Sequence, residues 1–170
     1  MEFDFTTLIT DRTAEDVKYW EHLRNKGFAD MTEAERAEWL AGTLKGAYNA
    51  GDLNRVGEAL NYLRDRLLSA NYITYRTNFT AKTDWTIASI PTHDDVVHYK
   101  TCVATVRKAM AQFPTTPPAP KTTGGTLDNI GALDYEEANN IEKILLDVET
   151  LINNMLAARH YCGDVYAGEI

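Results

Sequence analysis

The stretch "YEEANNIEKILLDVETLINNM", Tyr135–Met155, carries the clearest structural pattern in this chain of 170 residues. Its apolar side chains recur at alternating steps of four and three residues, the spacing of one helix face and of a heptad seam. Asp134 stands in the N-cap position, with Glu137 three residues later. We predict a long C-terminal helix within 127–160, of which residues 135–160 would make a rod of about 39 Å. The predicted seam is Ile141, Leu145, Val148, Ile152 and Met155.

Four more helix starts are marked by a capping residue ahead of apolar residues at helical spacing. Gly27 and Gly42 are placed to end the first two of these helices. The four helices lie within residues 10–113. The predicted fold is mainly α, a single domain over residues 1–170 built as a small bundle of about five helices. The predicted caps are Thr13, Thr32, Asp52 and Thr92.

Several segments lack helical periodicity. Residues 71–90 alternate with a period of two and are rich in β-branched and aromatic side chains, which predicts a short β-strand or hairpin near 72–87. Residues 1–9 are predicted to form an extended N-terminal arm. Four prolines and a Gly-Gly pair make residues 114–126 a linker. Residues 161–170 are predicted to form an extended C-terminal tail.

The stretch "KGAYNAGDLNRVGEALNYL", Lys45–Leu63, raises the question of a phosphate-binding loop. A Walker loop requires G-x-x-x-x-G-K-[ST], and a dinucleotide loop requires G-x-G-x-x-G after a buried strand; neither pattern is present. Asp52 would also put a negative charge where a phosphate binds. We predict a helical corner instead, in which Asn49 or Gly51 adopts a left-handed backbone conformation and Asp52 caps the helix. Gly57 is predicted to allow the close approach of another helix or an aromatic ring.

The charge is unevenly distributed. The chain has a net charge of −8, and its three segments 1–42, 43–126 and 127–170 carry −5, +4 and −7. Either the acidic end segments pack beside the basic middle, which we favour, or the polarity orients the protein against a partner. An acidic chain does not make a general nucleic-acid binder, so we expect no direct contact with nucleic acid.

Membrane insertion and secretion are not expected. No apolar run approaches the roughly 20 residues that a membrane span requires. The first ten residues, "MEFDFTTLIT", are acidic and alternating, which is unlike a signal peptide.

The best candidate for a metal site is a group of histidines and aspartates at the start of the fourth helix. Asp94 and His98 are spaced i, i+4 on one face, so they could bind a metal or form an ion pair. Two ligands do not make a site, and we predict no metal and no cofactor. The group is His93, Asp94, Asp95 and His98.

Catalytic patterns are also lacking. There is no G-x-S-x-G motif, and neither Cys102 nor Cys162 lies in a recognisable catalytic context. Isolated cysteines of this kind are most often small buried hydrophobic residues. The carboxylates lie mostly in caps and on solvated faces. We therefore predict a protein that is not an enzyme.

Trp85 lies in the polar stretch "KTDWTIASIPT" and allows two interpretations. It either closes one end of the bundle as part of the core, which we favour, or is an exposed anchor for a partner.

Five stretches together resemble a family of phage and prophage proteins of Gram-positive bacteria. The match covers most of the chain in the same order. The resemblance implies a protein encoded among virion structural genes, near those for the tail and baseplate, without assigned catalytic residues. The stretches are "ITDRTAEDVKYW" (9–20), residues 31–63, "KTDWTIASIPT" (82–92), "YEEANNIEKILLDVETLINNM" (135–155) and "YCGDVYAGEI" (161–170).

From this resemblance we expect a non-enzymatic virion protein of the tail, baseplate or fibre, made in the bacterial cytoplasm. Its expected partners are other virion proteins or further copies of itself, as a homo-oligomer. Extended arms suit assembly because they can add main-chain hydrogen bonds to a neighbour. The candidate contact residues are Phe3, Phe5, Ile9, Trp85, Tyr161, Val165 and Tyr166.

Two alternatives stay open. The first is a small phage-encoded binding module, such as an inhibitor of a host factor, whose acidic ends engage a basic partner. The second is an enzyme or nucleotide-binding protein with a polar pocket that the sequence motifs do not reveal.

Overall fold

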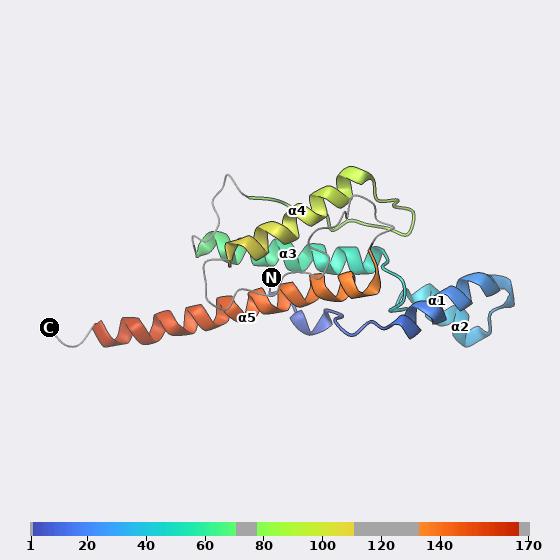
Figure 1. Ribbon diagram of the computed structural model, residues 1–170, viewed down its shortest axis with the longest axis horizontal. Coiled ribbons are helices and arrows are strands. Elements are labelled where there is room, and N and C mark those ends of the chain that lie inside the picture. Colours follow the sequence, from blue (N-terminus) through green and yellow to red (C-terminus); the bar gives the residue numbers. More distant parts are fainter. Residues whose placement is uncertain (1, 71–77, 111–132, 167–170) are drawn as a thin grey trace.

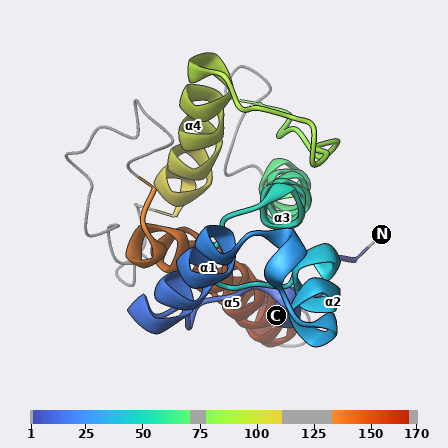
Figure 2. The same cartoon turned by 90° about the vertical axis from the view of Figure 1, so that its right-hand side faces the viewer.

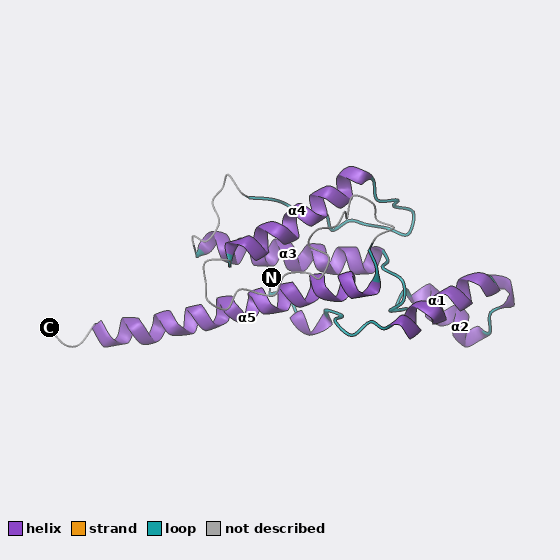
Figure 3. Cartoon of the chain, in the orientation of Figure 1, coloured by secondary structure: helices purple, strands orange, loops and turns teal. Residues whose placement is uncertain are grey.

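The computed structural model describes residues 2–70, 78–110 and 133–166, with side chains described as far as Ala158. Within these ranges the chain forms helices and loops and no strand (Figure 3). The prediction of a mainly α helical bundle is confirmed. The elements are two 3₁₀ turns, η1 (Phe5–Thr7) and η2 (Phe28–Asp30), and five α-helices, α1 (Ala14–Lys26), α2 (Glu33–Ala41), α3 (Ala50–Ser69), α4 (His93–Ala109) and α5 (Tyr135–Tyr166).

Helices α3, α4 and α5 pack side by side as the main bundle (Figures 1 and 2). Arg55 pairs with Glu142 and Arg66 with Glu149, so residue numbers rise together along α3 and α5, and these two helices run parallel. Four of the five seam residues predicted for α5 are at most 2% exposed. The fifth, Met155, packs against the core. The centre of the bundle is formed by Leu60, Leu63, Leu67, Val106, Leu145 and Val148.

Helices α1 and α2 lie together at the end of the bundle where α3 begins (Figure 1). They enclose a small apolar cluster of their own, separate from the main core. Because this pair has its own core, its position depends on the contacts that its connecting loops make with the bundle. The small cluster contains Leu23, Met31, Leu44, Trp20 and Trp39.

The predicted caps Thr13, Thr32 and Thr92 each stand at a helix start. Each threonine side chain accepts a hydrogen bond from the backbone of the acid three residues later, whose carboxylate accepts the cap's own N–H in return. Asp134 accepts from the Glu137 N–H at 2.7 Å. These local contacts satisfy N–H groups that a helix start leaves unpaired, so the short helices α1 and α2 have defined ends.

The predicted cap of α3 was wrong by three residues. Asn49 is the N-cap, and its side chain accepts from the N–H groups of Gly51 and Asp52 at 2.7 and 3.2 Å. Asp52 completes the capping box by accepting the Asn49 N–H at 2.9 Å. Asn49 is extended, with φ −107° and ψ −178°, and Gly51 is helical, so neither takes the predicted left-handed conformation. That conformation belongs to Gly42, at φ 64°, where α2 ends.

The predicted β segment is not seen. Its first part, residues 72–77, lies outside the described residues, and residues 78–87 form no strand. The backbone N–H and C=O groups of Ala81 and Trp85 are nevertheless hydrogen-bonded as they would be in a β-sheet. The side chains of two asparagines of α3 take the place of the neighbouring strand. Asn61 accepts the Ala81 N–H at 2.8 Å and donates to its carbonyl at 2.9 Å, and Asn54 does the same for Trp85 at 2.8 Å in both directions.

Glycines allow two close backbone approaches. A Cβ atom at Gly57 would overlap the carbonyl oxygen of Lys82. Gly57 therefore lets the loop that contains Lys82 lie against α3, whereas another helix or an aromatic ring was predicted to lie there. A Cβ atom at Gly46 would overlap the carbonyl of Asp16. Gly46 thereby lets the loop before α3 lie directly against α1.

The terminal arms also differ from the prediction. Residues 5–7 form a 3₁₀ turn, and Phe3 and Phe5 pack edge-to-face, 5.0 Å between ring centroids, against the protein's own core. Helix α5 continues to Tyr166, so the first six residues of the predicted tail are helical. The linker at 114–126 lies outside the described residues.

The contact at Gly57 gives a first prediction. Gly57→Ala should lower the free energy of unfolding by about 1–3 kcal/mol, because the new methyl group overlaps Lys82. Helix propensity alone would raise stability by about 1 kcal/mol. Urea denaturation measures the difference, with exposed Glu58→Ala in the same helix as the neutral control. A Gly57→Ala variant that is more stable than the wild type would contradict the packing described here.

Candidate functional site

A cluster of charged side chains lies buried where the N-terminal segment meets α3 and α5. The Arg12 guanidinium donates to Asp52 at 3.0 Å and to Glu142 at 2.7 Å. Arg55 pairs with the same two carboxylates. Arg12 and Asp52 are each 4% exposed and Glu142 is fully buried. Two positive and two negative side chains offset one another, which a water-excluded position requires.

Backbone hydrogen bonds tie the N-terminal segment to the same place. Glu142 accepts the Ile9 N–H at 2.6 Å, and Arg12 donates to the Ile9 carbonyl at 2.7 Å. Asn139 accepts the Arg12 N–H at 3.0 Å and donates to its carbonyl at 2.8 Å. One turn of α5 therefore fixes residues 9–12, which lead directly into α1.

Two tyrosines lie beside the charge cluster. The Tyr48 and Tyr99 hydroxyl groups are 2.5 Å apart, and Arg12 lies over the Tyr48 ring at 5.3 Å from its centroid. Burial, reinforced by nearby negative charge, raises the pKa of both phenols above the usual value. Both tyrosines are therefore protonated and act as hydrogen-bonding groups within the fold. The charge cluster and its tyrosines hold the N-terminal segment against the bundle from inside the fold.

Cys102 and His98 form a close pair that resembles a catalytic dyad. The Cys102 sulfur lies 3.6 Å from His98 Nε2. That nitrogen is also 2.8 Å from the Thr80 carbonyl, an acceptor, so it carries the proton and cannot take one from the thiol. Cys102 is fully buried, and burial raises the pKa of its thiol to about 11. The pair does not form an activated nucleophile.

Two of the four candidate metal ligands make other contacts. Asp95 completes the cap at Thr92, and His98 bonds Thr80. Among the residues that the structure describes, no group of three or more histidine, cysteine or acidic side chains is placed to hold a metal ion.

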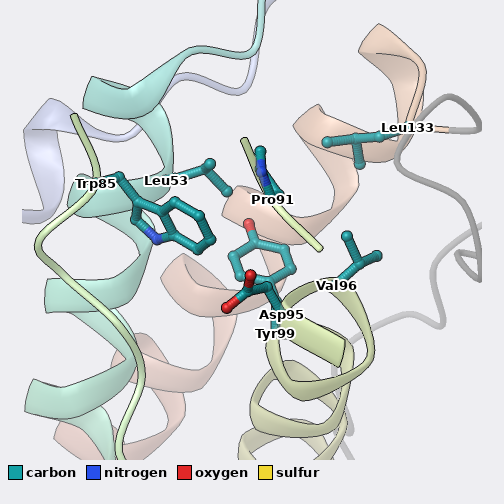
Figure 4. Close-up of a pocket in the computed structure, with 7 residues that line it drawn as sticks. All are labelled: Leu53, Trp85, Pro91, Asp95, Val96, Tyr99 and Leu133. Carbon is teal, nitrogen blue, oxygen red and sulfur yellow. The ribbon is translucent and has the colours of Figure 1, made fainter. Parts of the chain in front are cut away.

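A small cavity of about 20 Å³ lies under the loop that contains Trp85. Figure 4 shows Tyr99 between Trp85 and Leu53 on one side and Leu133 and Val96 on the other. The space is about that of one water molecule, and its lining is apolar, so it offers neither room nor polar partners for a ligand. Trp85 is 8% exposed, so of its two interpretations the core position is the one observed.

A second, open groove lies on the outer side of Trp85. It has a volume of about 470 Å³ and lies between the end of α2, the start of α3 and residues 85–91. Leu40 and Ile87 stand at this groove with 73% and 102% of their surface exposed, and Ile90 nearby is 87% exposed. We call these residues and the groove the apolar groove. Exposed apolar surface of this kind marks binding surfaces.

The predicted contact residues do not come together. Phe3 and Phe5 are half-buried and pack against the protein's own core, and the half-buried Ile9 is bonded to the charge cluster. Tyr161, Val165 and Tyr166 lie in the last turns of α5, at the far end of the molecule (Figure 1), and their side chains are outside the described part.

Sequence reasoning missed both the charge cluster and the apolar groove. The sequence signal for the charge cluster was weak. It consists of Glu142 directly after the seam residue Ile141, and of Arg55 three residues after Asp52. The groove had no distinct sequence signal, because Leu40 is an apolar residue just before the predicted helix end at Gly42 and Ile87 lies at the end of the predicted β segment.

Comparison of the chain with protein-family models, with curated proteins and with solved structures finds no match. None of the helices in the described part of the chain combines the length and apolar character needed to cross a membrane.

The charge cluster gives a second prediction. Arg12→Ala should lower the free energy of unfolding by about 3–5 kcal/mol, because it leaves Glu142 buried beside fewer positive charges. The matched control is Lys45→Ala, which removes the more exposed pair with Asp11 at 2.7 Å and should cost less than about 1 kcal/mol. Equal losses in the two variants, measured by urea denaturation, would contradict a structural role for the cluster.

The state of Cys102 gives a third prediction. In the folded protein at neutral pH, iodoacetamide should alkylate Cys102 far more slowly than in urea, since the thiol is buried and protonated. Peptide mapping by mass spectrometry separates its signal from that of Cys162. Rapid alkylation of Cys102 without denaturant would show an accessible thiolate and reopen the enzyme hypothesis.

Proposed function

We propose that this chain is a non-enzymatic structural component of a phage virion, in the tail, baseplate or fibre region. It is made in the bacterial cytoplasm and incorporated into the particle, where it contacts other virion proteins or further copies of itself. The resemblance of five sequence stretches to phage and prophage proteins supports a phage origin for this chain.

The projection of α5 beyond the bundle is the observation that carries the proposal. Helix α5 has 32 residues and α3 has 20, lengths of about 48 and 30 Å. Both helices begin at the same end of the bundle, and α5 runs well past the others (Figure 1). From residue 153 to 158 no side chain is buried. A helix end of this length is marginal in water without packing, so a neighbouring surface would stabilise it.

The interior supports a building block more than a catalyst. The buried Arg12 is paired with both Asp52 and Glu142, and the Cys102 thiol is buried and protonated. The N-terminal arm packs against the protein's own core through Phe3 and Phe5, so the proposal does not rely on assembly through this arm.

A small binding module that inhibits a host factor remains the second candidate, favoured by the apolar groove and the net charge of −8. An acidic module would capture a basic host protein, and the complex would weaken as salt screens the charges.

The proposal predicts that tryptic peptides of this chain occur in digests of density-gradient-purified particles. Their amount should stay in constant ratio to the major tail proteins across fractions. A phage replication protein from the same lysate is the control for carry-over. Absence from particles, together with salt-sensitive capture of one host protein, would contradict the virion role and favour the inhibitor.

A further inference from the structure

The apolar groove has a buried floor and two exposed edges. Leu53 and Trp85 in the floor are buried, and Tyr48 beside them is half-buried. Leu40 of α2 stands at one edge and Ile87 at the other, and both are largely or fully exposed to water. Removing apolar side chains from water is favourable in proportion to the area covered. A partner that covers the groove would therefore gain most from the two edges.

Ile87 is held on a well-defined turn. Ser89 donates its N–H to the Thr86 carbonyl at 2.9 Å, and the Ser89 hydroxyl accepts the Thr86 N–H at the same distance. The residue before the turn is fixed as well, because Asn54 of α3 bonds both backbone groups of Trp85. An apolar side chain on a fixed turn loses little conformational entropy when it binds.

The space between the two edges has room for an aliphatic side chain. Its volume of about 470 Å³ is within the range of pockets that hold a small molecule. The same patch thus presents a projecting apolar side chain, Ile87, and beside it a hollow with an apolar floor that can accept one. A patch of this kind is complementary to itself, which is what a contact between two copies about a two-fold axis requires.

The charge of the chain favours contact between copies at this patch. The net charge is −8, so two copies repel each other on average. Among the described residues no charged side chain lines the groove, so contact there brings no lining charge against a like charge, which is costly at an interface. A charged segment of another protein would instead lose water in the groove without gaining a partner. A second copy of the same uncharged patch meets neither cost.

We infer that the apolar groove of one copy packs on the same groove of a second copy about a two-fold axis, with Ile87 of each copy seated between the edges of the other's groove. A contact of the same patch on both subunits is isologous and closes at two chains. It is built on few side chains, so the dimer is a weak one. The inference rests on the proposed structural role, to which it adds the partner.

Two variants test the contact from opposite edges of the groove. Ile87→Glu and Leu40→Glu each bring a charge into the contact, and each should weaken the dimer about tenfold or more. Both side chains are exposed, so the variants should stay folded, which circular dichroism checks. Val97→Glu is the matched control, because Val97 is 39% exposed on α4 and does not line the groove. Sedimentation velocity up to about 1 mM, the range of weak complexes, measures association.

The sedimentation data can overturn the inference in three ways. A wild-type chain that stays monomeric over the whole range would do so. Association of Ile87→Glu or Leu40→Glu as strong as that of the wild type would place the contact elsewhere on the chain. Assemblies that grow beyond two chains would show a heterologous contact and rule out the two-fold arrangement.

A pair of introduced cysteines tests whether Ile87 enters the groove of the other copy. Ala50 lines the groove at the start of α3. With Cys162→Ser in both chains, Ile87→Cys and tagged Ala50→Cys should form a mixed disulfide-linked dimer when mixed with oxidised glutathione. Tagged Ala50→Cys alone is the control and should form far less. A mixture that gives no more cross-linked product than this control would overturn the inference.

The particle digest separates this inference from the virion role. A monomeric wild-type chain that is present in particles would end the dimer and leave the virion role standing. A dimeric chain that is absent from particles would keep the groove-to-groove contact and end the virion role.

Discussion

The pairing of Arg12 with Glu142 and Asp52 ties the N-terminal segment, which leads into α1, to the bundle. It joins three parts of the chain that are far apart in sequence: the segment before α1, the first turn of α3 and the second turn of α5. Asp52 also completes the capping box of α3, so the start of that helix and the position of the N-terminal segment are set by one carboxylate. Removing charges from water is costly, and the pairing recovers that cost only when all partners are in place. The charge cluster therefore favours one arrangement of these elements.

The position of the α1–α2 pair depends on the charge cluster, because the apolar cluster of this pair is separate from the main core. Two further links are short-range: the close approach of Gly46 to Asp16 and the hydrogen bond from the Asn49 side chain to the Gly42 carbonyl at 2.9 Å. The apolar groove lies between the end of α2 and the start of α3, so its shape follows from how this pair is held. The stability of the buried charge cluster and the shape of the exposed apolar groove are thus coupled.

The sequence predicts what is decided locally. Caps at Thr13, Thr32 and Thr92 depend on residues three apart, and the α5 seam repeats within one helix, so both can be found by inspection. The cluster could not be found in this way because Arg12 and Glu142 are 130 residues apart and each resembles a charge on a solvated face. Over the described residues 78–87 the β prediction failed for a related reason. An alternation of residue types indicates an extended backbone. The pattern does not say whether the N–H and C=O groups of that backbone bond to another strand or to the side-chain amides of Asn54 and Asn61.

A double-mutant cycle between Arg12 and Glu142 measures whether the two buried side chains stabilise the fold as a pair. Arg12→Met and Glu142→Leu each leave a buried charge with fewer partners, whereas the double variant removes both charges and leaves apolar side chains of similar length. We expect the double variant to lose much less stability than the two single losses combined, with a coupling free energy of about 2 kcal/mol or more in urea denaturation. Losses that add to within about 0.5 kcal/mol would mean that the two side chains do not act as a pair, and would contradict the account.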